Sequence, residues 1–121
     1  MPEGARDERG SSPSKTPESL NSSALYREIY RTGERYRGSA IKAVYRSNTL
    51  GGIRLGFSVS RKTGIAVKRN LFKRRIRALT RENGIGLNAD MILSPVGRLE
   101  KATWNSLRDD FLCLLKLIGR R

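Results

Sequence analysis

Apolar residues recur at helical spacing near both ends of the chain. The first set follows Asn21, Ser22 and Ser23, any of which can cap a helix, and Gly33 ends that helix. Its members are Leu25, Tyr26, Ile29 and Tyr30. The second set follows Thr103, a suitable cap, and its members are Trp104, Leu107, Phe111, Leu114, Leu115 and Ile118. This spacing predicts an amphipathic helix at each end of the ordered chain.

Two neighbouring stretches in the middle of the chain predict strands. Over Ile53–Ser60 apolar and polar residues alternate, which indicates a strand with one buried face. Over Ser39–Arg46 the alternation is less regular, but β-branched and aromatic residues favour a strand there too. Because residues 47–52 read as a turn, we expect these two strands to pair as a hairpin. The short apolar run Ala89–Leu93 predicts a further, buried strand.

A third helix is predicted over Ala66–Glu82, which lacks Gly and Pro and is rich in Arg, Lys, Leu and Ala, until Asn83 and Gly84 end it. The order helix, strand, strand, helix, strand, helix indicates an α/β (α+β) sandwich, with about three helices packed on a small mixed sheet. We expect a single domain over residues 21–121. Residues 1–20 are rich in Ser, Pro, Gly and mixed charge, so we expect a disordered tail there.

The excess of basic over acidic residues indicates which class of molecule the protein binds. The chain has 25 Lys and Arg against 11 Asp and Glu, a net charge of +14, and a polyanion would relieve the resulting repulsion. It has no histidine, the commonest general base and metal ligand. Asp109 and Asp110 point to different sides of the last predicted helix, and we expect both in solvent. Nucleic acid is therefore the expected partner, and we expect no metal site in the protein.

Cysteine content and hydropathy indicate the compartment. The single Cys113 allows no internal disulfide, and we expect it in the core of the last helix. No apolar stretch approaches the roughly 20 residues that span a bilayer, and the N-terminus has no signal-peptide apolar region. We expect a cytoplasmic protein without membrane contact.

Positive charge is concentrated in the middle of the chain. Between Glu34 and Glu82 there is no acidic residue, although like charges four apart in a helix repel by about 0.2–0.5 kcal/mol per pair. On a helical wheel of the third helix, Phe72, Ile76 and Leu79 form an apolar face. A second, contiguous face consists of Arg69, Asn70, Lys73, Arg74, Arg77 and Arg81. We predict that this face binds phosphate, because the planar guanidinium group of arginine can bind two phosphate oxygens at once.

Several aromatic residues precede the basic helix, namely Tyr26, Tyr30, Tyr36, Tyr45 and Phe57. Unpaired bases can stack on such side chains, at about 1–3 kcal/mol per base, whereas a duplex offers no such contact. Core packing is the alternative role. We favour the core for Phe57 and leave both roles open for the tyrosines.

A gapped signature spans the second predicted strand and the basic helix. It consists of Gly56-Phe57-Ser58-Val59-Ser60-Arg61-Lys62, then Gly64, Ala66-Val67, Arg69-Asn70, Lys73-Arg74-Arg75 and Arg77. In this signature the chain resembles the protein component of bacterial ribonuclease P, and the similarity extends more weakly from Leu25 to the last helix. Two positions depart from the family pattern: Leu71 stands where a third basic residue is common, and Ile65 where a polar residue is common.

The resemblance implies the protein subunit of a ribonucleoprotein endoribonuclease whose catalyst is its RNA. That RNA, with bound Mg²⁺, would hydrolyse precursor tRNA to release the 5′ leader and leave the mature 5′ end. The protein would contain no catalytic residue and would bind no metal tightly. The implied partners are the catalytic RNA and precursor tRNA, with no obligatory protein partner. The resemblance also implies a left-handed strand–helix–strand crossover, against the usual right-handed rule.

Roles for individual residues follow from the basic run and the resemblance together. The residues expected to bind RNA are Arg61, Lys62, Lys68, Arg69, Asn70, Lys73, Arg74, Arg77 and Arg81. The resemblance also implies that Tyr26, Tyr30 and Tyr45 line a cleft that holds the single-stranded leader.

Composition alone supports another function equally well, that of a ribosomal or general RNA- or DNA-binding protein with no enzyme partner. The nucleic acid that copurifies with the protein would distinguish the two. An intrinsic nuclease is disfavoured, because a chain without histidine and with few acids in its basic region offers no general base.

Overall fold

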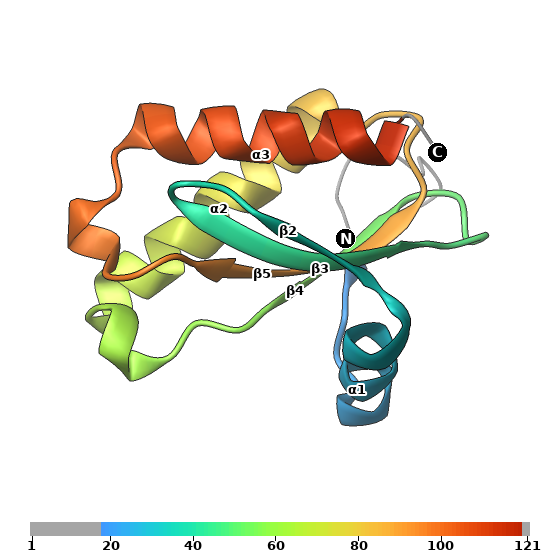
Figure 1. The fold of residues 1–121 in the computed structure, drawn as a ribbon, viewed down its shortest axis with the longest axis horizontal. Coiled ribbons are helices and arrows are strands. Elements are labelled where there is room, and N and C mark those ends of the chain that lie inside the picture. Colours follow the sequence, from blue (N-terminus) through green and yellow to red (C-terminus); the bar gives the residue numbers. More distant parts are fainter. Residues whose placement is uncertain (1–17, 120–121) are drawn as a thin grey trace, which may run out of the picture.

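The computed structural model describes residues 18–119, which form a five-stranded sheet with helices on both faces (Figure 1). The strands are β1 (Glu18–Ser19), β2 (Glu34–Arg37), β3 (Ile41–Ser47), β4 (Ile53–Phe57) and β5 (Ala89–Pro95). The helices are α1 (Ser23–Thr32), α2 (Ala66–Asn83) and α3 (Trp104–Gly119), with short 3-10 turns η2 (Arg61–Thr63) and η3 (Leu99–Lys101). The expected α/β class, a mixed sheet with three helices, is confirmed.

The order of strands in the sheet is β1-β4-β5-β3-β2. Strand β5 is parallel to β4 and antiparallel to β3, so it lies between the two strands that we expected to form a hairpin. That hairpin is therefore wrong. The reason lies in β5, which is buried at every position except Ser94 and so requires a neighbour on each side.

Helix α2 connects the parallel neighbours β4 and β5, so these three elements form a strand–helix–strand crossover. Its left hand stays a prediction.

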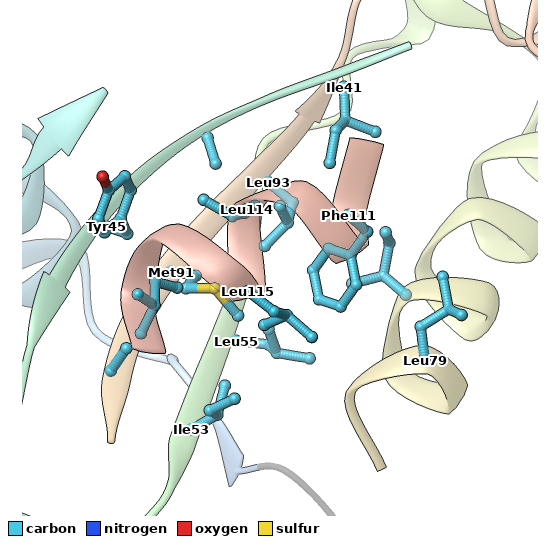
Figure 2. Packing of buried hydrophobic residues seen from close by; sticks show 14 of the residues in the cluster. Ile41, Tyr45, Ile53, Leu55, Leu79, Met91, Leu93, Phe111, Leu114 and Leu115 are labelled. Atoms are coloured by element: carbon cyan, nitrogen blue, oxygen red, sulfur yellow. The ribbon is translucent and has the colours of Figure 1, made fainter. Parts of the chain in front are cut away.

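The two faces of the sheet are covered differently. Helices α2 and α3 lie on one face and α1 on the other (Figure 1). Figure 2 shows Phe111, Leu114 and Leu115 of α3 packed with side chains of the sheet in the main core. A smaller cluster on the α1 face consists of Leu20, Ile29, Val44 and Ile92. Because β3 and β5 supply side chains to both clusters, the sheet is the common support for everything built on either face.

The helix ends confirm the predicted caps. The Ser22 hydroxyl accepts a hydrogen bond from the backbone N–H of Leu25 at 3.3 Å, and Gly33 follows the last residue of α1. At the start of α3, the Thr103 hydroxyl accepts from the backbone N–H of Ser106 at 3.1 Å. These bonds satisfy backbone donors that a helix leaves free in its first turn.

The expected disordered tail ends earlier than predicted. Glu18 and Ser19 form β1, which pairs with β4, and Leu20 is buried. The predicted boundary at residue 20 is therefore wrong, because the apolar side chain of Leu20 packs with Ile29 and Val44. The remainder of the predicted tail, residues 1–17, lies outside the described residues.

Two side chains of α3 also differ from expectation. Cys113 is exposed, because it lies one residue away from the apolar stripe that faces the core. Asp109 is exposed as predicted, but the Asp110 carboxylate accepts hydrogen bonds from the backbone N–H groups of Ala40 and Ile41 at the start of β3. A β-carbon at Gly38 would lie 2.5 Å from that carboxylate, so glycine permits the close approach. Asp110 therefore fixes α3 to the sheet.

Candidate nucleic-acid interface

One face of α2 presents basic groups because the other face packs on the sheet. Phe72, Ile76 and Leu79 are at most 3% exposed, which confirms the predicted apolar face. The predicted RNA-binding residues all lie on η2 or α2 and none is buried. Arg61, Lys62, Lys68, Asn70, Arg74 and Arg81 are exposed, and Arg69, Lys73 and Arg77 are half-buried. The structure therefore brings the predicted set together on two consecutive elements.

Local hydrogen bonds fix η2 against the first turn of α2. The carbonyl oxygen of Ser60 accepts from both the backbone N–H and the hydroxyl of Thr63, at 3.1 and 2.6 Å. The Arg69 Nε donates to the carbonyl oxygen of Gly64 at 3.1 Å, which ties the turn to the helix. Arg61 and Lys62 are therefore held beside the start of α2, and within residues 18–119 the terminal nitrogens of Arg69 remain available as donors.

Two arginines of α2 lie over aromatic rings. The Arg77 guanidinium carbon is 5.3 Å from the centroid of Phe57, and that of Arg75 is 5.1 Å from the centroid of Trp104. Phe57 in turn meets Phe72 edge to face, with centroids 6.2 Å apart, so its predicted core role is confirmed. Cation–π contacts of this kind hold a guanidinium group in place. Arg77 is thus preorganised, whereas Arg75 is directed towards α3.

The first turn of α2 lacks a side-chain cap. Ile65 occupies the N-cap position, makes no capping hydrogen bond and is 68% exposed. In the variant Ile65→Asn a side-chain oxygen could accept from a free N–H of the first turn. We expect this variant to raise the free energy of unfolding by about 1 kcal/mol, and hence the midpoint of thermal unfolding by about 4–8 °C.

Circular dichroism during heating measures this effect. The control is Ile65→Ala, which also lacks a capping group and should unfold close to the wild-type temperature. Equal melting temperatures for the Asn and Ala variants would contradict the capping argument.

A cavity of about 380 Å³ opens on the opposite face of the sheet, beside α1. Its lining comprises Tyr30, Arg35, Tyr36, Arg37, Lys42, Ala43, Val44, Ser58, Ile92 and Ser94. Val44 and Ile92 belong to the apolar cluster on this face, and Tyr30 is 37% exposed at its α1 side. In the register of β2 and β3, Arg35 pairs with Val44 and Arg37 with Lys42, so the three cations share this face. The cavity thus combines apolar surface, an exposed aromatic ring and positive charge.

The sequence did not predict a site role for Arg35, Arg37, Lys42, Ser58 or Ser94. The available signal was the spacing of Arg35 and Arg37, which are two residues apart and so lie on one face of a strand. Recognising it required knowing that residues 34–37 form an edge strand.

The tyrosines that were expected to share one cleft are separated. Of the three, only Tyr30 lines the cavity. The Tyr26 hydroxyl accepts from the backbone N–H of Phe57 at 3.0 Å, and a β-carbon at Gly56 would lie 2.5 Å from that hydroxyl oxygen. Tyr26 therefore anchors α1 on the end of β4, and Gly56 permits the close approach.

The expectation that Tyr45 lines the cleft is wrong. Its side chain is 5% exposed and belongs to the main core, on the face covered by α2 and α3 (Figure 2). The alternation of β3 places Tyr45 on the same side as Ile41 and Ala43, and Val44 on the side of the cavity.

A buried carboxylate joins the three central strands. Asp90 of β5 is fully buried and lies opposite both Arg46 of β3 and Arg54 of β4. Its Oδ1 accepts from Arg54 Nε and Asn48 Nδ2, both at 2.8 Å. Its Oδ2 accepts from Arg54 Nη2 at 2.9 Å and Arg46 Nε at 3.3 Å. Burial raises the pKa of the Asp90 carboxyl, but these hydrogen bonds outweigh burial and lower the pKa below its usual value.

The same network reaches α1, the helix that carries Tyr30. Arg46 Nη1 donates to Glu28 Oε2 at 3.0 Å and to the Thr32 hydroxyl at 3.4 Å. Arg46 therefore bridges the Asp90 carboxylate and α1. This cluster was not predicted from the sequence, where its only signal is a single acid inside the apolar run Ala89–Leu93.

Within residues 18–119, no group of three or more Cys, Asp or Glu side chains could hold a metal ion. In the same part of the chain, no helix has the length and hydropathy needed to cross a bilayer.

Comparisons with known proteins agree with this geometry. The sequence pattern of the family described as ribonuclease P matches residues 15–119. The ribonuclease P protein component of Syntrophomonas wolfei is 29% identical over 102 residues, covering 83% of this chain and 86% of the relative. The ribonuclease P protein of Staphylococcus aureus, solved at 2.0 Å, superposes with a TM-score of 0.73 at 26% identity, covering 82% of this chain and 93% of its own. That of Thermotoga maritima gives a TM-score of 0.69 at 28% identity, covering 86% and 97%. On the strength of the pattern match over most of its length and of these structural likenesses, the chain belongs to the bacterial type of ribonuclease P protein component.

Proposed function

We propose that this chain acts in the cytoplasm as the protein subunit of ribonuclease P. In this role the face formed by η2 and α2 binds the catalytic RNA, and the cavity beside α1 holds the 5′ leader of precursor tRNA. The observation that carries the proposal is the presence of two cation-rich surfaces on opposite faces of one sheet, which can engage two nucleic acid segments at once.

The cavity suits a single strand better than a duplex. Its exposed Tyr30 ring can stack on an unpaired base, and Arg35, Arg37 and Lys42 can neutralise the backbone that connects successive bases. Base stacking and phosphate contacts depend little on sequence, so leaders of different sequence can be bound. This is the property that a subunit acting on many precursor tRNAs needs.

The chain contributes to cleavage by binding and charge neutralisation. The catalytic RNA, the tRNA and the leader are all polyanions, and the positive charge of this chain between them lowers their mutual repulsion. Magnesium ions held mainly by the RNA subunit would supply the activation of water and the stabilisation of the leaving group. The residues of η2 and α2 position the RNA subunit, and those of the cavity position the leader.

Cleavage of a labelled precursor tRNA tests the proposal. A bacterial ribonuclease P RNA is assayed at low magnesium with and without this chain, and the chain is also assayed alone. We expect faster cleavage with the mixture than with the RNA alone, and none with the chain alone. Tight RNA binding without any stimulation would instead favour a ribosomal or general RNA-binding protein.

Tyr30→Ala should weaken the binding of precursors with long leaders. The variant removes the ring on which a leader base stacks, so we expect a loss of about 1–3 kcal/mol in binding to the assembled holoenzyme. A precursor with a one-nucleotide leader, which need not reach Tyr30, should lose little. The two dissociation constants are measured with the same holoenzyme preparation.

The control for Tyr30→Ala is Tyr45→Phe, which alters a tyrosine on the opposite face of the sheet and should leave both constants unchanged. Equal losses for the long and short leaders in the Tyr30 variant would assign Tyr30 to the fold rather than to the leader.

A further inference from the structure

We propose that residues 98–101, here called the η3 segment, extend the RNA-binding surface of α2. The inference rests on the proposed function and adds Arg98 and Lys101 to the residues that contact the RNA subunit. Both lie in the connection between β5 and α3, outside the acid-free basic stretch of the sequence.

The η3 segment lies against the elements that already form the RNA-binding surface. Arg98 Nη1 donates to the backbone carbonyl of Lys62 in η2 at 3.4 Å. Leu99 and Lys68 both line a cavity of about 120 Å³ between the segment and α2. In Figure 1 the green turn η2, the orange turn η3 and the first turn of α2 lie at the same end of the molecule. The positive surface of α2 therefore continues onto the segment.

One exposed acid lies among these cations. Glu100 accepts from Arg98 Nε, and the side chains of the pair are 56% and 57% exposed respectively. The Arg98 guanidinium lowers the pKa of the Glu100 carboxyl, and Lys101 and Lys68 act in the same direction. Three cations thus surround a single carboxylate, which leaves a net positive charge.

A phosphate group of the RNA can replace the Glu100 carboxylate at the Arg98 guanidinium. Carboxylate and phosphate oxygens fit the same planar fork of a guanidinium group. Arg98 is exposed, and its bond to η2 places it next to the first turn of α2. An RNA backbone that runs along α2 to this turn can therefore contact Arg98. Glu100 then competes with the RNA for Arg98, and its removal should favour binding.

Binding of the full chain to a bacterial ribonuclease P RNA over a range of monovalent salt concentrations tests this inference. We expect Arg98→Ala and Lys101→Ala each to weaken binding about two- to fivefold. Each should also reduce the slope of log affinity against log salt by about 0.7–0.9. We expect Glu100→Gln to tighten binding by a similar factor of about two to five.

Matched controls separate a local contact from a general effect of charge. Lys116→Ala removes an exposed cation from the far end of α3, and Asp109→Asn removes an exposed acid that pairs with Arg108 at 3.4 Å. Both should bind like the wild type. Melting temperatures, expected to be unchanged because all these sites are exposed, show that the variants are folded.

The outcomes distinguish this inference from the proposed function. If Arg74→Ala weakens binding while the Arg98, Lys101 and Glu100 variants bind like the wild type, the inference is overturned and the proposed function stands. A gain with Asp109→Asn equal to that with Glu100→Gln also overturns it. If the wild-type chain does not bind this RNA, the proposed function itself fails.

Discussion

Replacing Asp90 with alanine is expected to lower the free energy of unfolding by about 3 kcal/mol, because breaking a buried ion pair leaves its partners uncompensated. The partners are Arg46 and Arg54, whose side chains are only 24% and 21% exposed. Asn48 Nδ2 loses an acceptor as well. Chemical denaturation at neutral pH measures the change.

The dependence on pH gives an independent check. The pKa of Asp90 is lowered in the folded state, so its contribution to stability is fully present above the unfolded value of about 3.9. It is lost as the pH falls through the lower, folded pKa, when the carboxylate takes up a proton. The difference in stability between the wild type and Asp90→Asn should therefore be constant near neutral pH and should shrink below about pH 4.

Arg54→Ala provides the control for the Asp90 variants. If the network is the cause, the double variant of Asp90 and Arg54 should lose less stability than the sum of the single losses. Additive losses, or wild-type stability of Asp90→Ala at neutral pH, would contradict the role assigned to the network.

The local pattern of the sequence predicted the helices well, because each helix carries its own signals. The expected span Ala66–Glu82 differs from α2 by one residue at its end, and Thr103 caps α3 as predicted. Both signals are contained within one helix and its flanks: apolar spacing and a capping side chain.

Pairing between strands could not be predicted in the same way. The turn at residues 47–52 suggested a hairpin, but β3 and β4 each pair with β5, which is distant in sequence. The strand Ile53–Ser60 was also expected to be three residues longer than β4, and β1 and β2 were not predicted. The pairing follows from the burial of β5, which needs a neighbouring strand on each side, and that burial is a property of the assembled fold.

The residues of the candidate site also differ in whether they could be predicted from local sequence. The basic face of α2 follows from helical geometry and could be predicted residue by residue. The face on which Tyr45 lies follows from the register of β3, which the irregular alternation of Ser39–Arg46 did not reveal. Asp90 needed both neighbouring strands in place before its partners Arg46 and Arg54 could be identified.

Replacing Arg74 with alanine should weaken the binding of this chain to the RNA subunit. Arg74 is exposed and makes no hydrogen bond or ion pair within residues 18–119, so its guanidinium is free to bind phosphate. Loss of a bidentate, charge-assisted contact should weaken binding about tenfold at low salt. It should also reduce the log–log salt slope by about 0.7–0.9. Binding titrations over a range of salt concentrations measure both quantities.

Variants of Arg74 and Arg69 separate charge from geometry. Arg74→Lys keeps the charge but loses the planar fork, so it should preserve the salt slope and lose only part of the affinity. Arg69→Ala should reduce the slope as Arg74→Ala does, and should also lower stability, because Arg69 Nε bonds to the carbonyl of Gly64. Arg27→Ala, at an exposed position on α1 across the sheet, should change neither quantity. An unaltered slope in both alanine variants of α2 would show that this face does not contact the RNA. Each phosphate contact that is lost leaves a counterion bound to the RNA, and the salt slope must then become smaller.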